Sequence, residues 1–256
     1  MEMPLQAETV FFVGQFPITN AILDMLFVDL VLFLGVFFLR KRLKLIPGIF
    51  QNIVESLIKT FYDLTETIAG VRAKMIFPFF MTFFIVILIA NWSELIPGFS
   101  SIGFLKEHDN EKVLVPLFRS ATSDLNTTLA LAAISAAATH ILSIRVLGIK
   151  EYLSRFFSLN PINMFVGLLE IVSEITKIIS LSFRLFGNIF AGGVLLGVIS
   201  GFFALIAPLP FLLLEIVVGL VQALIFAMLT MVFMAILTTP HREEHAKERT
   251  ERSSLA

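Results

Sequence analysis

The feature that most constrains this chain is one apolar tract, residues 163–237, which is far too long for a single membrane crossing. Between residues 178 and 240, its only ionisable side chains are those of Arg184 and Glu215. The whole chain is 57% hydrophobic and 15% charged, whereas soluble domains are typically about half apolar and about a quarter charged. A globule of this size cannot bury so much apolar surface, so the sequence predicts a protein that folds in lipid.

Composition also excludes several kinds of site. The chain has no cysteine, which rules out disulfides and cysteine-based metal or redox chemistry. Its four histidines are scattered without the spacing of metal ligands, and its net charge of −1 gives no indication of a nucleic acid partner. We therefore expect neither a metal nor a cofactor.

We predict an all-α integral membrane protein with five membrane-embedded helices plus one amphipathic interfacial helix, because lipid does not tolerate open sheet edges. The embedded helices are expected at residues 18–39, 76–97, 121–147, 163–207 and 210–238. Pro208 and Pro210 separate the last two, which form a long hairpin. As a continuous helix, residues 163–207 would be about 65 to 70 Å long, against a hydrocarbon core of roughly 30 Å. This helix therefore either lies steeply tilted or breaks near Gly192 and Gly193.

Residues 49–70 form a different kind of helix, in which apolar side chains recur every three or four positions and charged ones lie opposite. Phe50, Leu57 and Phe61 belong to the apolar face, and Lys59 and Asp63 belong to the charged face. The pattern predicts a helix that lies along the membrane surface or packs against another subunit, and the sequence leaves both open.

Basic residues indicate the orientation of the chain. They gather at residues 40–44, at 145–155 and in the tail at 241–256, and five spans place all three groups on one side. By the positive-inside rule that side is the cytoplasm, so we expect the N-terminus outside and the C-terminus inside. The expected location is the inner membrane of a bacterium, with an organelle inner or thylakoid membrane as the alternative.

Polar side chains follow one face of the predicted helix 163–207. They fall within a wedge of roughly 80° at the usual 100° per residue, and they are Glu170, Glu174, Lys177, Arg184 and Asn188. On the other arm of the hairpin, Glu215 and Gln222 are seven residues apart and share a face. Two polar stripes therefore face each other within an apolar hairpin.

The arginine in this stripe needs a polar environment. Its side chain cannot lose its proton, and a charge at the middle of a lipid-facing helix costs from roughly 2.5 to above 10 kcal/mol. Arg184 and Glu215 could simply pair, or the stripe could be a hydrogen-bonded seam between helices. A path for an ion, lined by polar side chains, explains better than either alternative why two acidic side chains, one turn apart, lead to an arginine.

Several segments resemble subunit a of the F-type ATP synthase, the ion-channel stator subunit. The most specific one is SFRLFGNIFAG at residues 182–192, and residues 215–230 resemble the matching helix of that family. Further similar segments, in the family's order, are Pro47-Gly48 with Gln51-Asn52, NWSELIPG at residues 91–98 and TSDLNTT at residues 122–128. The likeness covers nearly the whole chain.

The resemblance implies partners as well as a function. The chain would be the proton-translocating subunit of a rotary ATP synthase and would hold no catalytic site of its own. Arg184 would be the essential arginine that faces the carboxylate on the rotating c-ring, with Asn188 and Gln222 beside it. Peripheral-stalk b subunits and the remainder of the complex would be its other partners.

The same resemblance implies two half-channels. Glu170 would lie in the half-channel open to the cytoplasm, with Glu174 as a less typical neighbour. Glu215 would lie in the half-channel open to the outside. Gly193 departs from the family, where an acidic or histidine side chain is common, so the second relay group of the outer half-channel stays undefined.

Two other classes of function compete with this interpretation. A self-contained secondary transporter is disfavoured because the sequence shows no inverted repeat. A structural anchor for soluble partners is disfavoured because the tail at residues 241–256 is short and mixed in charge. The transported ion is expected to be a proton, although the sequence does not distinguish it from sodium.

Overall fold

The computed structural model describes residues 8–96, 102–108, 111–117, 119–156, 161–202 and 208–239. Most of this part of the chain is helical. Four stretches of it are long and apolar enough to cross a membrane, namely Asn20–Lys41, Ile49–Ser93, Leu125–Leu147 and Pro208–Leu237. The structure is therefore that of a mostly helical integral membrane protein. The predicted tail at residues 241–256 lies outside the described residues.

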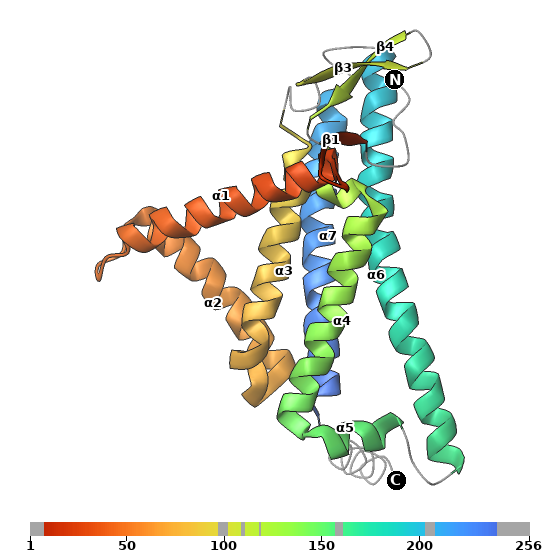
Figure 1. Cartoon of the computed structure of the whole chain (residues 1–256). Helices are drawn as coiled ribbons and strands as arrows, with labels where there is room; N and C mark the ends of the chain where they lie inside the picture. Colours follow the sequence, from red (N-terminus) through yellow and green to blue (C-terminus); the bar gives the residue numbers. More distant parts are fainter. Residues whose placement is uncertain are drawn as a thin grey trace.

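The first two helices project from the rest of the molecule (Figure 1). Helix α1 (Asn20–Arg42) begins where the Thr19 side chain accepts a hydrogen bond from the backbone N–H of Ile22. It runs away from the other helices, and a bend then leads into α2 (Ile49–Ala69), the predicted amphipathic helix. Gly70 ends α2 with a positive φ of 55°, a conformation that favours glycine. The chain therefore turns there, through the short η1 (Gly70–Arg72), into α3.

Three helices form the centre of the structure. They are α3 (Ala73–Ser93), α4 (Leu125–Leu147) and α7 (Pro208–Leu237). Phe80 of α3 and Phe226, Met231 and Met234 of α7 are completely buried between them. Hydroxyl groups add bonds between helices, because Ser135 of α4 and Thr230 of α7 lie 2.8 Å apart.

Helix α6 (Pro161–Phe202) packs along this centre and is the longest element. It is continuous over 42 residues, about 63 Å, and passes Gly192 and Gly193 without a break. Of the two alternatives expected for this segment, the break is therefore wrong. One end of α6 packs against α4 and α7, and the other end diverges from α7 (Figure 1).

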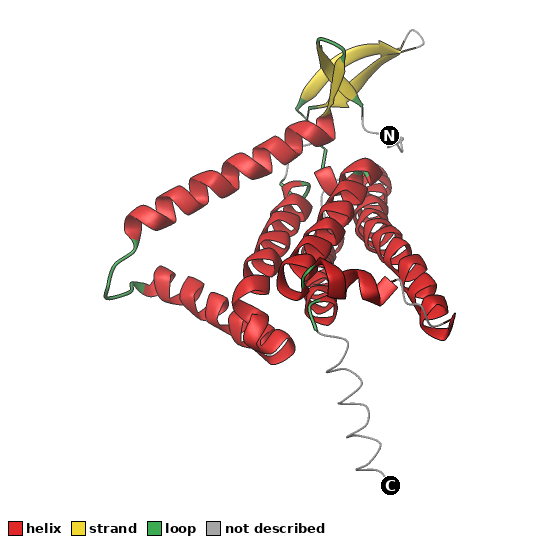
Figure 2. Ribbon diagram, turned by 60° about the horizontal axis from the view of Figure 1, so that its bottom comes forward, coloured by secondary structure: helices red, strands yellow, loops and turns green. Residues whose placement is uncertain are grey.

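The structure adds elements that the sequence pattern did not reveal. Two antiparallel hairpins, β1 (Thr9–Val13) with β2 (Phe16–Thr19) and β3 (Gly103–His108) with β4 (Glu111–Pro116), lie together at one end of the helices (Figure 2). A single turn, η3 (Ala121–Ser123), precedes α4. At the opposite end, the short helix α5 (Ile149–Phe156) connects α4 towards α6. These pieces are too short to carry a membrane-span signal.

Candidate functional site

Helix α6 leaves Arg184 on an open face of the molecule. The side chain borders a cavity of about 450 Å³ between α6 and α7, whose polar lining on α6 consists of Ser173, Thr176, Lys177, Ser180 and Arg184. Residue Arg184 is exposed, and among the described residues it takes part in no ion pair or hydrogen bond. The guanidinium therefore stands at the end of a groove of hydroxyl groups and is available to a group from outside the chain.

The structure separates Arg184 from Glu215. The Glu215 carboxylate lies against Gly192, where it fills the space that a Cβ would need. Gly192 is eight residues beyond Arg184 on α6, or about 12 Å along the helix axis. The alternative in which these two side chains simply pair is thus not the arrangement seen. Gly193, the position that departs from the family, is buried.

Asn188 and Gln222 meet beside Arg184, as the facing stripes suggested. Asn188 lies one turn along α6 from Arg184, and its Nδ2 donates to Gln222 Oε1 at 2.9 Å. Gln222 is buried on α7, and its own Nε2 has no hydrogen-bond partner among the described residues. A buried amide donor without a partner is costly, which suits a position where a water or another chain's polar group approaches.

The predicted acidic residues Glu170 and Glu174 lie in a larger cluster near α5. We call this the α5 cluster; its members are Glu170, Glu174, Lys177, His140, Tyr152 and Arg155. Arg155 Nε lies 2.5 Å from Glu170 Oε1, and Lys177 Nζ lies 2.7 Å from Glu174 Oε1. His140 Nε2 lies 3.7 Å from Glu174 Oε2. The two carboxylates are thus held by cations rather than left free.

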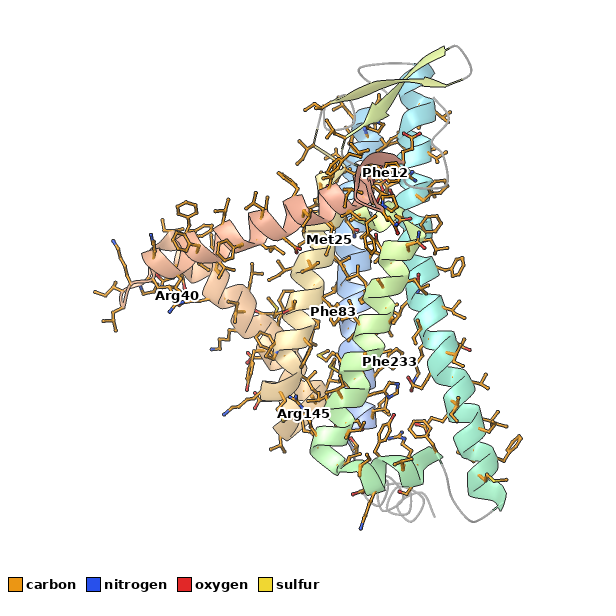
Figure 3. All side chains as sticks on the ribbon, viewed as in Figure 1. Phe12, Met25, Arg40, Phe83, Arg145 and Phe233 are labelled. Atoms are coloured by element: carbon orange, nitrogen blue, oxygen red, sulfur yellow. The ribbon has the colours of Figure 1, made fainter. Side chains whose placement is uncertain are left out.

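Three members of the α5 cluster were missed by reasoning from the sequence. His140, Tyr152 and Arg155 come from α4 and α5, and no spacing links them to the stripe on α6. Tyr152 nevertheless shows the effect of this environment, because burial and the carboxylates of Glu174 and Glu170 raise its pKa above the usual range. Figure 3 shows Arg145 near the end of α4 that leads into α5.

A second polar cluster lies at the other end of the helices, around η3. This η3 cluster consists of Asp24, Asn91, Ser93, Glu94, Ser120 and Thr122. Asp24 is buried on α1, and its Oδ2 accepts hydrogen bonds from Ser93 Oγ at 3.0 Å and from the Ala121 backbone N–H at 2.8 Å. Thr122 Oγ1 donates to Asn91 Oδ1 at 2.8 Å. These bonds hold the start of α1 and the end of α3 against η3.

The η3 cluster is joined to the helix that carries Glu215. Asn91 Nδ2 donates to the Gly219 carbonyl at 3.0 Å, and Trp92 Nε1 donates to the Ile216 carbonyl at 3.2 Å. Glu94 directly follows Ser93, the last residue of α3. Burial raises the pKa of Glu94 to about 7, and the negative charge of Glu215 adds to the increase. A second titratable carboxyl therefore stands near Glu215, which the sequence presented only as the boundary of a span.

The chain is similar to known proteins over most of its length. The chain matches the family model described as ATP synthase A chain over residues 22–235. It is 30% identical to ATP synthase subunit a of Moorella thermoacetica over 226 residues, and these residues make up 88% of this chain and 94% of that protein. It is 34% identical to ATP synthase subunit a 2 of Pelobacter propionicus over 231 residues, which make up 89% of this chain and 90% of that protein. It is 36% identical to ATP synthase subunit a of Desulfotalea psychrophila over 220 residues, which make up 84% of this chain and 80% of that protein.

The matched region contains every part of the site described above: the groove at Arg184, the Asn188–Gln222 contact and the two polar clusters. The relatives cover most of this chain and most of their own length. On this evidence the chain belongs to the ATP synthase A chain family.

Proposed function

We propose that the chain is the proton-translocating stator subunit of a rotary ATP synthase and that it works through two offset half-channels. The observation that carries the proposal is the exposed Arg184 at the end of a polar groove, which forms no ion pair with any other residue that the structure describes. A permanent cation at this depth in an apolar helix needs an anionic partner. The chain itself supplies none among its described residues, so a carboxylate on another subunit is the natural candidate.

The partner at Arg184 is a rotating ring of c subunits. A carboxylic acid on the ring can pass through lipid while it is protonated, because the neutral form avoids most of the cost of a buried charge. When it reaches Arg184, the fixed positive charge favours release of the proton. The same charge repels free protons and so prevents a direct leak between the two sides. The Asn188–Gln222 pair beside Arg184 offers polar contacts to the arriving carboxylate.

Two polar passages serve this exchange from opposite ends of α6. On one side, the groove runs from Arg184 past Ser180 and Thr176 to Lys177. Lys177 pairs with Glu174 of the α5 cluster, and we assign this side, with Glu170, to the inner half-channel. On the other side, Glu215 and Glu94 lead towards the η3 cluster, and this is the outer half-channel. The transmembrane potential, worth about 2.3 kcal/mol per charge at 100 mV, drives the proton through both.

The topology follows from the same assignment. Five helices, α1, α3, α4, α6 and α7, are embedded, with α6 and α7 as the tilted hairpin beside the ring, and α2 lies at the cytoplasmic surface. The N-terminus and the β-hairpins face outside, and α5 and the C-terminus face the cytoplasm of a bacterium. The exposed apolar side chains of α1, among them Phe33 and Phe38, suit contacts with lipid and with a peripheral-stalk b subunit.

Replacement of Arg184 by alanine tests this proposal. In reconstituted complexes, Arg184→Ala should abolish ATP-driven proton pumping, because the ring carboxylate then has no fixed charge to discharge against. Arg145→Ala, which removes an exposed arginine at the end of α4, is the matched control and should keep pumping. Undiminished pumping by Arg184→Ala would refute the assignment. Purification in mild detergent separates it from a transporter or an anchor, because only the proposed subunit should be recovered with a c-ring and a soluble ATPase.

A further inference from the structure

His140 occupies a position in the α5 cluster that the proposed function leaves without a role. Its imidazole lies between α5 and α6, with Nδ1 3.0 Å from the Tyr152 hydroxyl and Nε2 3.7 Å from Glu174 Oε2. The His140 side chain is 27% exposed and the Glu174 side chain is 12% exposed. Water can therefore reach the imidazole more easily than the carboxylate that it faces.

The other charged groups near His140 are fixed in pairs. Lys177, on α6, holds Glu174 through Oε1, and Arg155, on α5, holds Glu170. Helix α7 contributes Phe233, whose ring centre lies 4.4 Å from the Lys177 ammonium. Lysine and arginine ordinarily keep their charge at neutral pH, whereas an imidazole ordinarily changes its charge between about pH 5 and about pH 8. The histidine is the member of the cluster suited to sense pH.

We propose that His140 positions Glu174 for proton transfer and that protonation of this imidazole slows the inner half-channel. The inference rests on the proposed function, in which Glu174 belongs to the passage open to the cytoplasm. In the neutral tautomer with the hydrogen on Nε2, Nδ1 accepts a hydrogen bond from the Tyr152 hydroxyl. Nε2 then faces Glu174 Oε2 at 3.7 Å, beyond hydrogen-bond length. A proton from the cytoplasmic side then binds at Nδ1, and the Tyr152 hydroxyl turns to accept from the new N–H.

This protonation changes the surroundings of Glu174. Its carboxylate then has a cation at each oxygen, Lys177 at Oε1 and the imidazolium at Oε2. A carboxylate flanked by two cations favours its ionised form and takes up a proton from the passage less readily. Proton flow through the inner half-channel should therefore decrease as the cytoplasmic solution becomes acidic.

The pH dependence of His140→Gln tests the proposal. Whole complexes are reconstituted with the ATPase sector outside, so that external pH acts on the cytoplasmic face, and the initial rate of ATP-driven proton pumping is measured. The rate of the variant divided by that of the wild type should rise about tenfold as external pH falls from about 8 to about 5.5, because glutamine cannot become cationic. Dividing by the wild type at each pH removes the pH dependence of the ATPase sector.

Further variants and a change of side complete the test. Lys150→Gln, which removes an exposed charge on the same short helix, should keep a constant ratio to the wild type. His140→Asn serves as a second neutral variant if His140→Gln does not assemble. A ratio that stays flat with external pH, or that follows the pH inside the vesicle instead, overturns the inference. If Arg184→Ala still abolishes pumping in that case, the proposed function stands and the role of His140 alone fails.

Discussion

Glu94 provides a direct test of the electrostatics near Glu215. It follows the last residue of α3, and burial is the main reason why its pKa rises from 4.5 to about 7. The negative charges of Glu215 and, more weakly, Asp24 raise this pKa further, whereas the positive charge of Arg119 lowers it. Glu94→Gln places a neutral side chain of nearly the same shape at this position and removes its titration.

The effect on stability has a definite sign. Between pH 4.5 and about 7, the folded protein keeps a proton on Glu94 that the unfolded chain has already released. The free energy of unfolding therefore falls as pH rises through this window and is constant above it. A pKa shift of one unit corresponds to about 1.4 kcal/mol, so the shift of Glu94 from 4.5 to about 7 gives a loss of at most about 3 to 4 kcal/mol. Glu94 is only half-buried, and screening by water reduces the loss to about 1 to 3 kcal/mol.

Thermal unfolding of the complex in lipid nanodiscs, followed over pH, measures this effect. The Tm of the wild type should fall more between about pH 4.5 and about pH 7 than that of Glu94→Gln, so the stability of the variant relative to the wild type should rise through this window. Glu66→Gln, which removes an exposed carboxyl on α2, is the control and should retain the wild-type dependence. If Glu94→Gln and the wild type lose stability in parallel, the assigned electrostatics are wrong.

Two further predictions concern packing and buried hydrogen bonds. Gly167→Ala should destabilise the protein by about 1 to 3 kcal/mol, because a Cβ there would overlap the Phe156 carbonyl at the end of α5. Gly35→Ala, inside α1 where a Cβ meets nothing, should not lower the Tm. Asp24→Leu should cost about 1 to 3 kcal/mol, because the Ala121 N–H loses its buried acceptor. Asp24→Asn keeps an acceptor oxygen, so an equal loss of Tm in both variants would contradict this account.

Much of the architecture could be predicted from the sequence, because hydrophobic periodicity is a local property. A run of apolar residues as long as that after residue 163 requires helices in lipid, and the prolines at 208 and 210 divide it. The structure begins α7 at Pro208. The spacing of Arg184 and Asn188 on α6, and of Glu215 and Gln222 on α7, likewise placed them on shared faces before any packing was known.

Tertiary structure decided which faces meet. Helical spacing could not tell that Glu215 lies against Gly192 rather than Arg184, because that depends on how α7 is shifted along α6. It also could not bring His140 and Tyr152 to Glu174, since these residues lie on three different helices. The sequence by itself thus determined the membrane helices and their polar stripes, through local periodicity and the cost of charge in lipid. Only helix packing decided which polar groups meet, which cation holds which carboxylate, and that Arg184 stays exposed without an ion pair to any other described residue.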